Sequence, residues 1–149
     1  MHDETTRRLP VGAEVQSDGG THFRVWAPAA RTVDVVFEGG ARPVLPMKRG
    51  EGGYFSGFPA HAAAGTRYRF RLDGGDALPD PASRFQPEGP HGPSEVVDPA
   101  SFAWTDAEWP GLVPHGQVIY EMHIGTFTPG GTYAAAATHL PYLRGLGIT

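Results

Sequence analysis

Residues 117–149 predict one strand and one helix, and this small unit limits what the whole chain can be. Residues 117–124 form a largely apolar run that is typical of a buried strand. A Gly/Pro-rich turn over residues 127–131 separates this run from an alanine-rich helix that extends to about Leu146. Such a strand is stable only within a larger sheet that is covered on both faces. We therefore expect the chain to be the N-terminal piece of a larger α/β enzyme, cut after its first strand–helix unit.

The predicted helix carries its own start, break and stop signals. Thr132 suits the N-cap position, because its hydroxyl can accept a hydrogen bond from a free backbone N–H of the first turn. Pro141 lacks a backbone N–H and predicts a kink or a break near Thr138–His139. Gly145 and Gly147 mark the C-terminal end.

Residues 22–72 predict antiparallel β-structure, because apolar and polar side chains alternate along several short segments. The apolar positions of these segments are Phe23, Val25, Val33, Val35, Phe37, Tyr68, Phe70 and Leu72. Turn signals separate the segments at residues 18–20, 28–30, 39–40, 50–53 and 73–75. Short strands at this spacing predict a mainly β fold, with an immunoglobulin-like antiparallel β-sandwich over residues 1–78.

The stretch over residues 79–99 has a different composition, with six prolines. Proline fixes φ and removes a hydrogen-bond donor, so this stretch suits neither a helix nor a central strand. We expect it to run extended over a surface and to pair briefly at Glu95–Val97. The expected domains are therefore the sandwich over 1–78, a proline-rich linker over 79–111 and the strand–helix unit over 112–149.

Composition excludes several classes of function. The formal net charge is −4 and no basic cluster is present, so we expect no nucleic-acid partner. No apolar run is long enough to span a membrane. Cys is absent, which removes thiol nucleophiles and disulfides, and the scattered His residues show no metal-ligand spacing. We expect no metal, no cofactor and a cytoplasmic location.

Three groups of side chains allow two interpretations each. Arg67, Arg69 and Arg71 could bind an anion or a following domain, but pairing across the sheet with Asp34 and Glu38 is favoured. Glu121 and His123 would share one face of a strand, either as a polar pair in an active site or as a buried hydrogen bond. The large aromatic residues could stack on sugar rings, but core or domain-interface packing is favoured. These aromatic residues are Trp26, Tyr54, Trp104 and Trp109.

Several segments together resemble a known family. Phe23-Arg-Val-Trp-Ala-Pro28 and Val118-Ile-Tyr-Glu-Met-His-Ile-Gly-Thr-Phe127 resemble the N-terminal sandwich and the first barrel strand of isoamylase-type and branching-enzyme-type members of the α-amylase superfamily. Leu140-Pro-Tyr-Leu-Arg-Gly-Leu-Gly-Ile148 resembles the end of their first barrel helix. The segment Leu78–Asp98 is similar to the linker of the malto-oligosyltrehalose trehalohydrolases, with Pro90 as a departure.

The resemblance implies a truncated (β/α)8 barrel after the sandwich, in a retaining glycoside hydrolase that releases trehalose from maltooligosyl trehalose. Retaining enzymes use two carboxyl groups, and the family places both on later barrel strands, so no catalytic residue is assigned here and the 149 residues alone are expected to be inactive. Barrel active sites form at the C-terminal ends of the strands. The resemblance therefore makes His123, Thr126 and Phe127 the candidate substrate-binding residues.

Other activities stay open at this point. A glycogen branching or debranching enzyme is the alternative within the superfamily. A stand-alone α-glucan-binding module and a purely structural domain are the alternatives outside catalysis. Among the partners, we expect an α-glucan and, in a full-length chain, the rest of the barrel.

Overall fold

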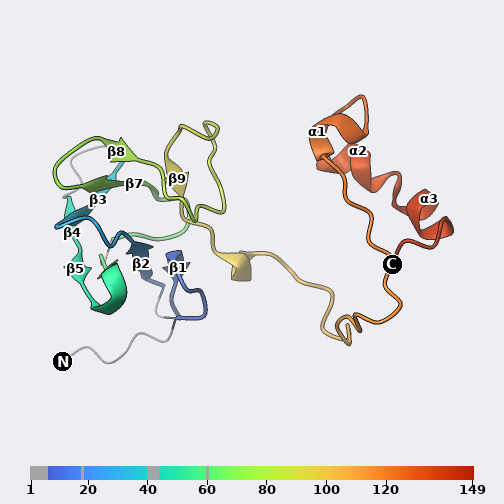
Figure 1. Cartoon of the computed structure of the whole chain (residues 1–149), viewed down its shortest axis with the longest axis horizontal. Helices are drawn as coiled ribbons and strands as arrows, with labels where there is room; N and C mark the ends of the chain where they lie inside the picture. The colour runs from blue at the N-terminus through green and yellow to red at the C-terminus, as the bar shows by residue number, and fades with distance from the viewer. Residues whose placement is uncertain (1–6, 18, 40–43, 60) are drawn as a thin grey trace. The chain divides into compact units, whose positions relative to one another are not determined.

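The computed structural model describes residues 7–17, 19–39, 44–59 and 61–149, and it forms two compact units over residues 1–103 and 104–149. The first unit is a two-sheet antiparallel sandwich (Figure 1). Sheet A has the strand order β1-β2-β6-β5, and sheet B has the order β4-β3-β7-β8, with β9 also paired to β7. Sheet A contains β1 (Gly12–Val15), β2 (Thr21–Trp26), β5 (Lys48–Arg49) and β6 (Tyr54–Gly57). Sheet B contains β3 (Val33–Phe37), β4 (Leu45–Pro46), β7 (Arg67–Leu72), β8 (Ala77–Leu78) and β9 (Ser94–Glu95).

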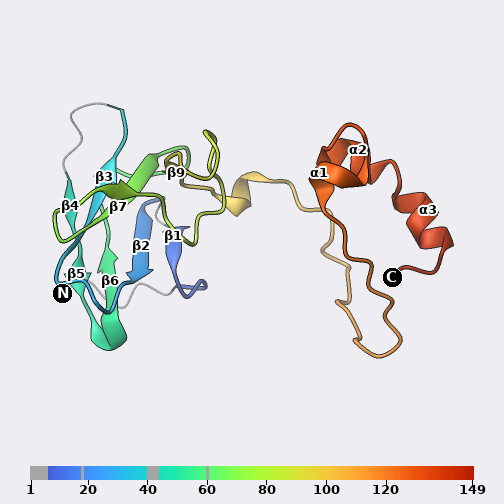
Figure 2. The same ribbon diagram turned by 45° about the horizontal axis from the view of Figure 1, so that its top comes forward.

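Figure 2 shows the strands of the first unit turned by 45° from the view of Figure 1. The alternation in the sequence decides which side chains enter the core between the two sheets. Phe23 from sheet A contacts Tyr68 from sheet B edge-to-face, with 4.8 Å between the ring centroids. All of the predicted apolar positions belong to this core or pack against it, which confirms the mainly β, antiparallel fold. Burial of each large apolar side chain contributes roughly 1.5–3 kcal/mol. Of the predicted turn positions, Asp18 and Gly40 lie outside the described residues.

The arginines of β7 pair with acidic groups on the outer face of sheet B, as predicted. Arg71 Nη2 lies 2.9 Å from Asp34 Oδ2, and Arg69 Nε lies 2.8 Å from Glu38 Oε1. Arg67 contacts Glu88 at 2.7 Å and Glu95 at 3.3 Å. Each exposed pair stabilises the fold only slightly, by about 0.2–1 kcal/mol. The main consequence of this ladder is that the charges of the face are neutralised internally.

The proline-rich stretch folds onto the sandwich through a buried polar network. Tyr68 Oη donates to Asp80 Oδ2 at 2.6 Å, and Asp80 N donates to Ser94 Oγ at 2.9 Å. Burial raises the pKa values of both Tyr68 and Asp80. The brief pairing expected near residue 95 is present as β9, whose Glu95 lies opposite Arg67. A 3-10 turn, η2 (Pro99–Ser101), follows with Asp98 as its cap.

The second unit corrects the prediction of a strand over 117–124. No ladder forms there among the described residues, and residues 124–127 are instead the short helix α1 (Ile124–Phe127). A strand needs a neighbouring strand to satisfy its backbone N–H and C=O groups. Among the described residues, the nearest approach to such pairing is the hydrogen bond from Thr149 N to the Val118 carbonyl. Side chains of residues 118–120 are correspondingly exposed, with Ile119 at 89%.

The predicted helix divides where the sequence indicates. It forms α2 (Tyr133–Ala137) and α3 (Leu140–Gly145), with the break at Thr138–His139 that Pro141 predicts. The Thr132 hydroxyl caps α2 by accepting from Ala135 N at 3.1 Å. Gly147, with a φ of +88°, ends α3 in a Schellman arrangement, because Ile148 N donates to the Leu143 carbonyl.

Replacing Tyr68 with Phe tests the buried network. We expect Tyr68→Phe to lower the free energy of unfolding by about 1–3 kcal/mol, because the variant leaves the buried Asp80 carboxyl without its hydroxyl partner. Urea denaturation measures the change. The control is Tyr54→Phe, since the Tyr54 ring is only half-buried and its stacking under Arg24 survives the change. Equal unfolding midpoints for the two variants would contradict the structural role of the network.

Limited proteolysis tests whether the proline-rich stretch over 79–99 is packed more tightly than residues 104–116. Residues 104–116 are all exposed, whereas the carbonyl of Phe85 accepts a hydrogen bond from Glu95 N. We expect chymotrypsin to cut after Leu112 or Tyr120 before it cuts after Phe85, although the Phe85 ring is itself half exposed. Mass spectrometry of the early fragments identifies the first site. Early cleavage after Phe85 would show that the stretch over 79–99 is not held on the sandwich.

Candidate functional site

The outer face of sheet A carries a row of aromatic and polar side chains from β2 and β6. The register places Trp26 opposite Tyr54 and Arg24 opposite Ser56. The inward neighbours Phe23, Val25 and Phe55 are buried, so the alternation turns the row toward solvent. The guanidinium of Arg24 lies over the Tyr54 ring, 4.2 Å from its centroid.

Trp26 is held in place although 57% of it is exposed. Its indole N–H donates to the Gly52 carbonyl at 3.0 Å. Gly53 has a φ of +83°, and a Cβ at this position would lie 2.7 Å from Pro28 Cα, so the turn beneath the indole requires glycine. The sequence favoured core or domain-interface packing for these tryptophans. Core packing is wrong for Trp26, Trp104 and Trp109, each of which is more than half exposed, and domain-interface packing stays a prediction. Tyr54 is half-buried.

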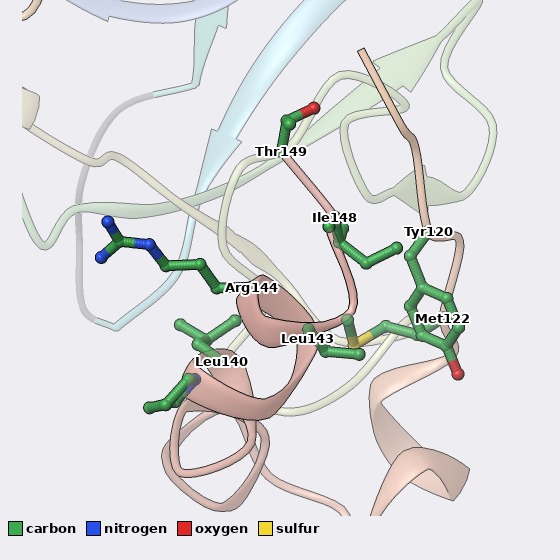
Figure 3. A pocket seen from close by; sticks show the side chains of 9 residues that line it. Tyr120, Met122, Leu140, Leu143, Arg144, Ile148 and Thr149 are labelled. Atoms are coloured by element: carbon green, nitrogen blue, oxygen red, sulfur yellow. The ribbon is translucent and has the colours of Figure 1, made fainter.

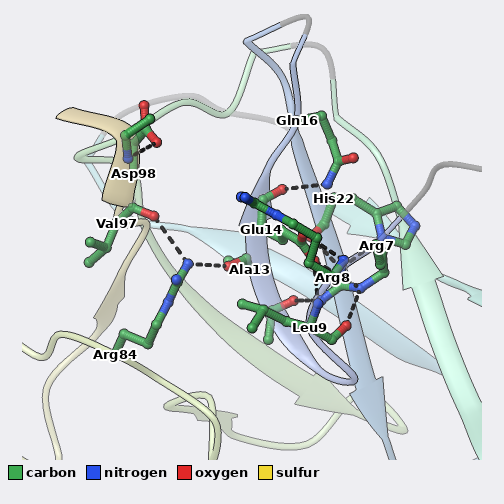
Figure 4. Close-up of polar contacts among 12 residues, drawn as sticks. Arg7, Arg8, Leu9, Ala13, Glu14, Gln16, His22, Arg84, Val97 and Asp98 are labelled. Carbon is green, nitrogen blue, oxygen red and sulfur yellow. Dashed lines mark hydrogen bonds and ion pairs between the residues drawn. The ribbon is translucent and has the colours of Figure 1, made fainter. Parts of the chain in front are cut away.

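A charged cluster lies beside this row at the edge formed by β1 (Figure 4). Arg7 Nη1 lies 2.7 Å from His22 Nδ1 and also donates to the His22 carbonyl at 2.8 Å. Glu14 Oε1 and Oε2 accept from the backbone N–H groups of Arg8 and Leu9. Burial alone would raise the pKa of Glu14, but these backbone donors and the Arg7 charge lower it. Burial, together with the nearby guanidinium groups, lowers the pKa of His22 to about 4.

Arg84 fastens the proline-rich stretch to the same edge of sheet A. Its Nη2 donates to the carbonyls of Ala13 and Val97, at 3.1 Å each. A cleft of about 270 Å³ lies here, lined by Arg8, Leu9, Glu14, Val15, Arg84 and Pro99. The carboxylate of Glu14 and the guanidinium groups of Arg7 and Arg84 are already bonded to one another or to the backbone. This edge of sheet A therefore has a structural role.

The predicted site residues of the second unit lie together around α1. His123 precedes the helix, its Nδ1 lies 3.4 Å from Thr126 Oγ1, and its carbonyl accepts from Thr126 N. The Phe127 ring lies between Tyr120 and His139, at centroid distances of 6.2 and 5.5 Å. The Glu121–His123 pair does not share a strand face, since no strand forms, and both side chains are exposed.

A larger hollow of about 820 Å³ lies between the segment that carries Tyr120 and Met122 and the residues of α3 and its C-terminal end (Figure 3). It is lined mainly by apolar side chains, including Tyr120, Met122, Leu143 and Ile148. His123, Thr126 and Phe127 are not among its lining residues. Arg144 and Thr149 are the polar side chains among its lining residues, and the rest of the lining is mainly apolar, which is the character of a packing surface.

Neither a metal site nor a membrane-spanning helix is present in the parts of the chain that the structure describes. Within them, no group of three or more His, Cys, Asp or Glu side chains is placed to hold a metal ion. In the same residues, every helix is too short or too polar to cross a membrane.

Comparison with known proteins finds similar chains among three named enzymes. The malto-oligosyltrehalose trehalohydrolase of Deinococcus radiodurans is 47% identical over 100% of this chain. The 1,4-alpha-glucan branching enzyme GlgB of Nocardia farcinica is 34% identical over 87% of it. A crystal structure described as a putative alpha amylase from Salmonella typhimurium covers 94% of the chain with a TM-score of 0.79 and 41% identity.

The match is to part of each relative. The chain spans 24% of the length of the Deinococcus enzyme, 19% of the Nocardia enzyme and 24% of the Salmonella chain. A family model described as "Carbohydrate-binding module 48 (Isoamylase N-terminal domain)" matches residues 10–101, which include both sheets and the docked proline-rich stretch. The chain therefore belongs to the carbohydrate-binding module 48 family, the N-terminal domain of isoamylases.

Proposed function

We propose that this chain is the front part of a retaining glycoside hydrolase that cleaves the α-1,4 bond next to the terminal trehalose of maltooligosyl trehalose and releases trehalose. The observation that carries the proposal is the likeness to the Deinococcus trehalohydrolase, because it extends over the whole chain. It therefore includes the stretch over 78–98, whose Asp80 and Ser94 build the buried network with Tyr68. That stretch is the most specific part of the resemblance.

We further propose that residues 112–149 begin a (β/α)8 barrel, after a sandwich over 1–78 and a linker over 79–111. One contact supports this arrangement. Thr149 N donates to the Val118 carbonyl at 3.2 Å, and Val118 N donates to Thr149 Oγ1 at 2.9 Å. The chain thus returns to residue 118 after passing through α2 and α3, as in a βαβ unit before its second strand is extended. Further strands would cover the exposed side chain of Ile119 and the apolar hollow beside it.

The start of the barrel would contribute substrate contacts, whereas the catalytic carboxyl groups would come from elsewhere in the barrel. No acidic residue here matches the family's catalytic positions, so nucleophile and general acid belong to later strands. His123, Thr126 and Phe127 remain our proposed substrate contacts, because they follow the segment that would form the first barrel strand. The Phe127–His139 ring contact would hold α1 in place against the following helices. A cytoplasmic location stays a prediction.

A chimera tests the trehalohydrolase assignment. Residues 1–149 replace the matching segment of the Deinococcus radiodurans enzyme, and trehalose release from maltooligosyl trehalose is measured. We expect the chimera to keep activity within about tenfold of the parent, a difference of about 1.4 kcal/mol in transition-state stabilisation, because the docking surfaces should be complementary. Residues 1–149 alone should release no trehalose.

The matched control is a second chimera that carries the corresponding segment of the Nocardia farcinica branching enzyme. Circular dichroism and thermal unfolding confirm that both chimeras fold. If both are equally active or equally inactive, the segment does not distinguish the two enzymes and the assignment to trehalohydrolase fails. If only the branching-enzyme segment supports activity, branching becomes the better assignment for this chain.

A further inference from the structure

We propose that the outer face of sheet A carries a binding site for a small oxyanion, formed by Arg24, Ser56 and Lys48. The class of ligand is an anion that presents phosphate or carboxylate oxygens. The site lies wholly within the sandwich. It goes beyond the proposed function, because it does not depend on the assignment to trehalohydrolase.

The three side chains form a row across neighbouring strands. Ser56 of β6 lies opposite Arg24 of β2 on one side and opposite Lys48 of β5 on the other. Directly opposed residues share a face of the sheet. This face is the outer one, because Met47 and Phe55, which alternate with the row, are buried. Neighbouring strands are about 4.8 Å apart. The two long cationic side chains therefore flank a short hydroxyl, and both can reach a ligand that lies above it.

Neither cation of this row forms an ion pair with an acidic side chain among the residues that the structure describes. The arginines that do form such pairs there are Arg7, Arg8, Arg67, Arg69 and Arg71. Arg24 is partly buried and Lys48 is exposed. Because like charges on one face repel each other, a bound anion would stabilise both cations.

The acidic residues in the described strands and turns of sheet A do not neutralise the row. Glu14 is buried at the β1 edge, and its two carboxylate oxygens accept from backbone N–H groups. Glu51 lies in the 3-10 turn η1 (Glu51–Gly53), which precedes β6 at its Tyr54 end. In a chain whose net charge is −4, a face with two unpaired cations is a local exception. Two cations suit a small anion rather than a polyanion.

Tyr54 holds the guanidinium of Arg24 in place without using its hydrogen-bond donors. The guanidinium carbon lies 4.2 Å from the centroid of the Tyr54 ring. The N–H groups of a guanidinium lie in its plane, so a contact with a ring face leaves them available at its edge. A donor set that is already fixed loses less entropy when it binds a ligand. Its hydrogen bonds to an oxyanion are charge-assisted and roughly twice as strong as those between neutral groups.

His22 reports on the charge at Arg24. Burial, followed by the charges of Arg7 and Arg24, lowers the pKa of His22 to about 4, and the charge of Glu14 acts in the opposite direction. An anion bound at Arg24 would offset part of the repulsion between the two side chains. The pKa of His22 should therefore rise when the site is occupied.

Titration of the 149-residue protein with sodium phosphate, followed by NMR at constant ionic strength, tests the site. We expect saturable shifts of the Arg24 Nε–H resonance and of the Ser56 backbone amide, which reports binding in every variant. Arg24→Gln and Lys48→Gln should each weaken the affinity by about tenfold, because each removes a charge-assisted contact. Arg31→Gln is the matched control, since it removes the same charge from an exposed arginine outside the row. Its affinity should equal that of the wild-type protein.

The pKa of His22, measured on the wild-type protein with and without phosphate, keeps the test independent of variant folding. We expect this pKa to rise when phosphate is present. A parallel titration with sodium acetate separates the two sources of oxygen ligands: binding of both anions assigns the site to oxyanions in general, and binding of one alone assigns it to that group. Equal shifts at all exposed arginines, an unchanged affinity in both Arg24→Gln and Lys48→Gln, or an unchanged pKa of His22 would each overturn the proposal.

Discussion

The hydrogen bond from Tyr68 to Asp80 is the contact on which the rest of the first unit depends. Tyr68 lies in the core between the sheets, and Asp80 lies near the start of the proline-rich stretch. The prolines leave this stretch few backbone N–H donors, so side-chain hydrogen bonds hold it on the sandwich. Ser94 extends the network to β9, and Arg84 then reaches the carbonyl of Ala13 in sheet A. Because buried polar groups are costly unless they are all satisfied, such a network permits one position of the stretch and few alternatives.

The two outer faces of the sandwich have different chemical characters, although both arise from the same alternation. On sheet B the outward residues are arginines and acids in register, and they neutralise one another. On sheet A the outward residues include Trp26, whose indole N–H is bonded to the backbone, and Arg24, whose guanidinium lies over the Tyr54 ring. A face whose groups are satisfied by each other has little left for a ligand. On sheet A, by contrast, the Trp26 ring stays more than half exposed although its N–H is bonded.

The sequence predicted the elements whose causes are local. Alternation located the strands, Thr132 the cap of α2, and Pro141 the break before α3. The sequence did not predict features that depend on contacts between residues far apart along the chain. A strand over 117–124 requires a neighbouring strand, and the burial of Asp80 requires Tyr68 from another strand. Core packing of Trp26 was also wrong, because size alone does not show which face of the sheet a tryptophan occupies or that Gly52 satisfies its N–H.

The partial burial of His22 and its contact with Arg7 make the stability of the sandwich sensitive to acid. His22 presents an unprotonated ring nitrogen to the guanidinium, and its pKa is about 4 in the folded chain against an ordinary value of 6.5. Between these two pH values the unfolded chain binds more protons than the folded one, so the free energy of unfolding decreases as the pH falls from about 6.5 toward 4. Above that window the imidazole is neutral in both states and the contribution is constant. Acid would therefore loosen the sandwich first where β1 and β2 meet the N-terminal segment.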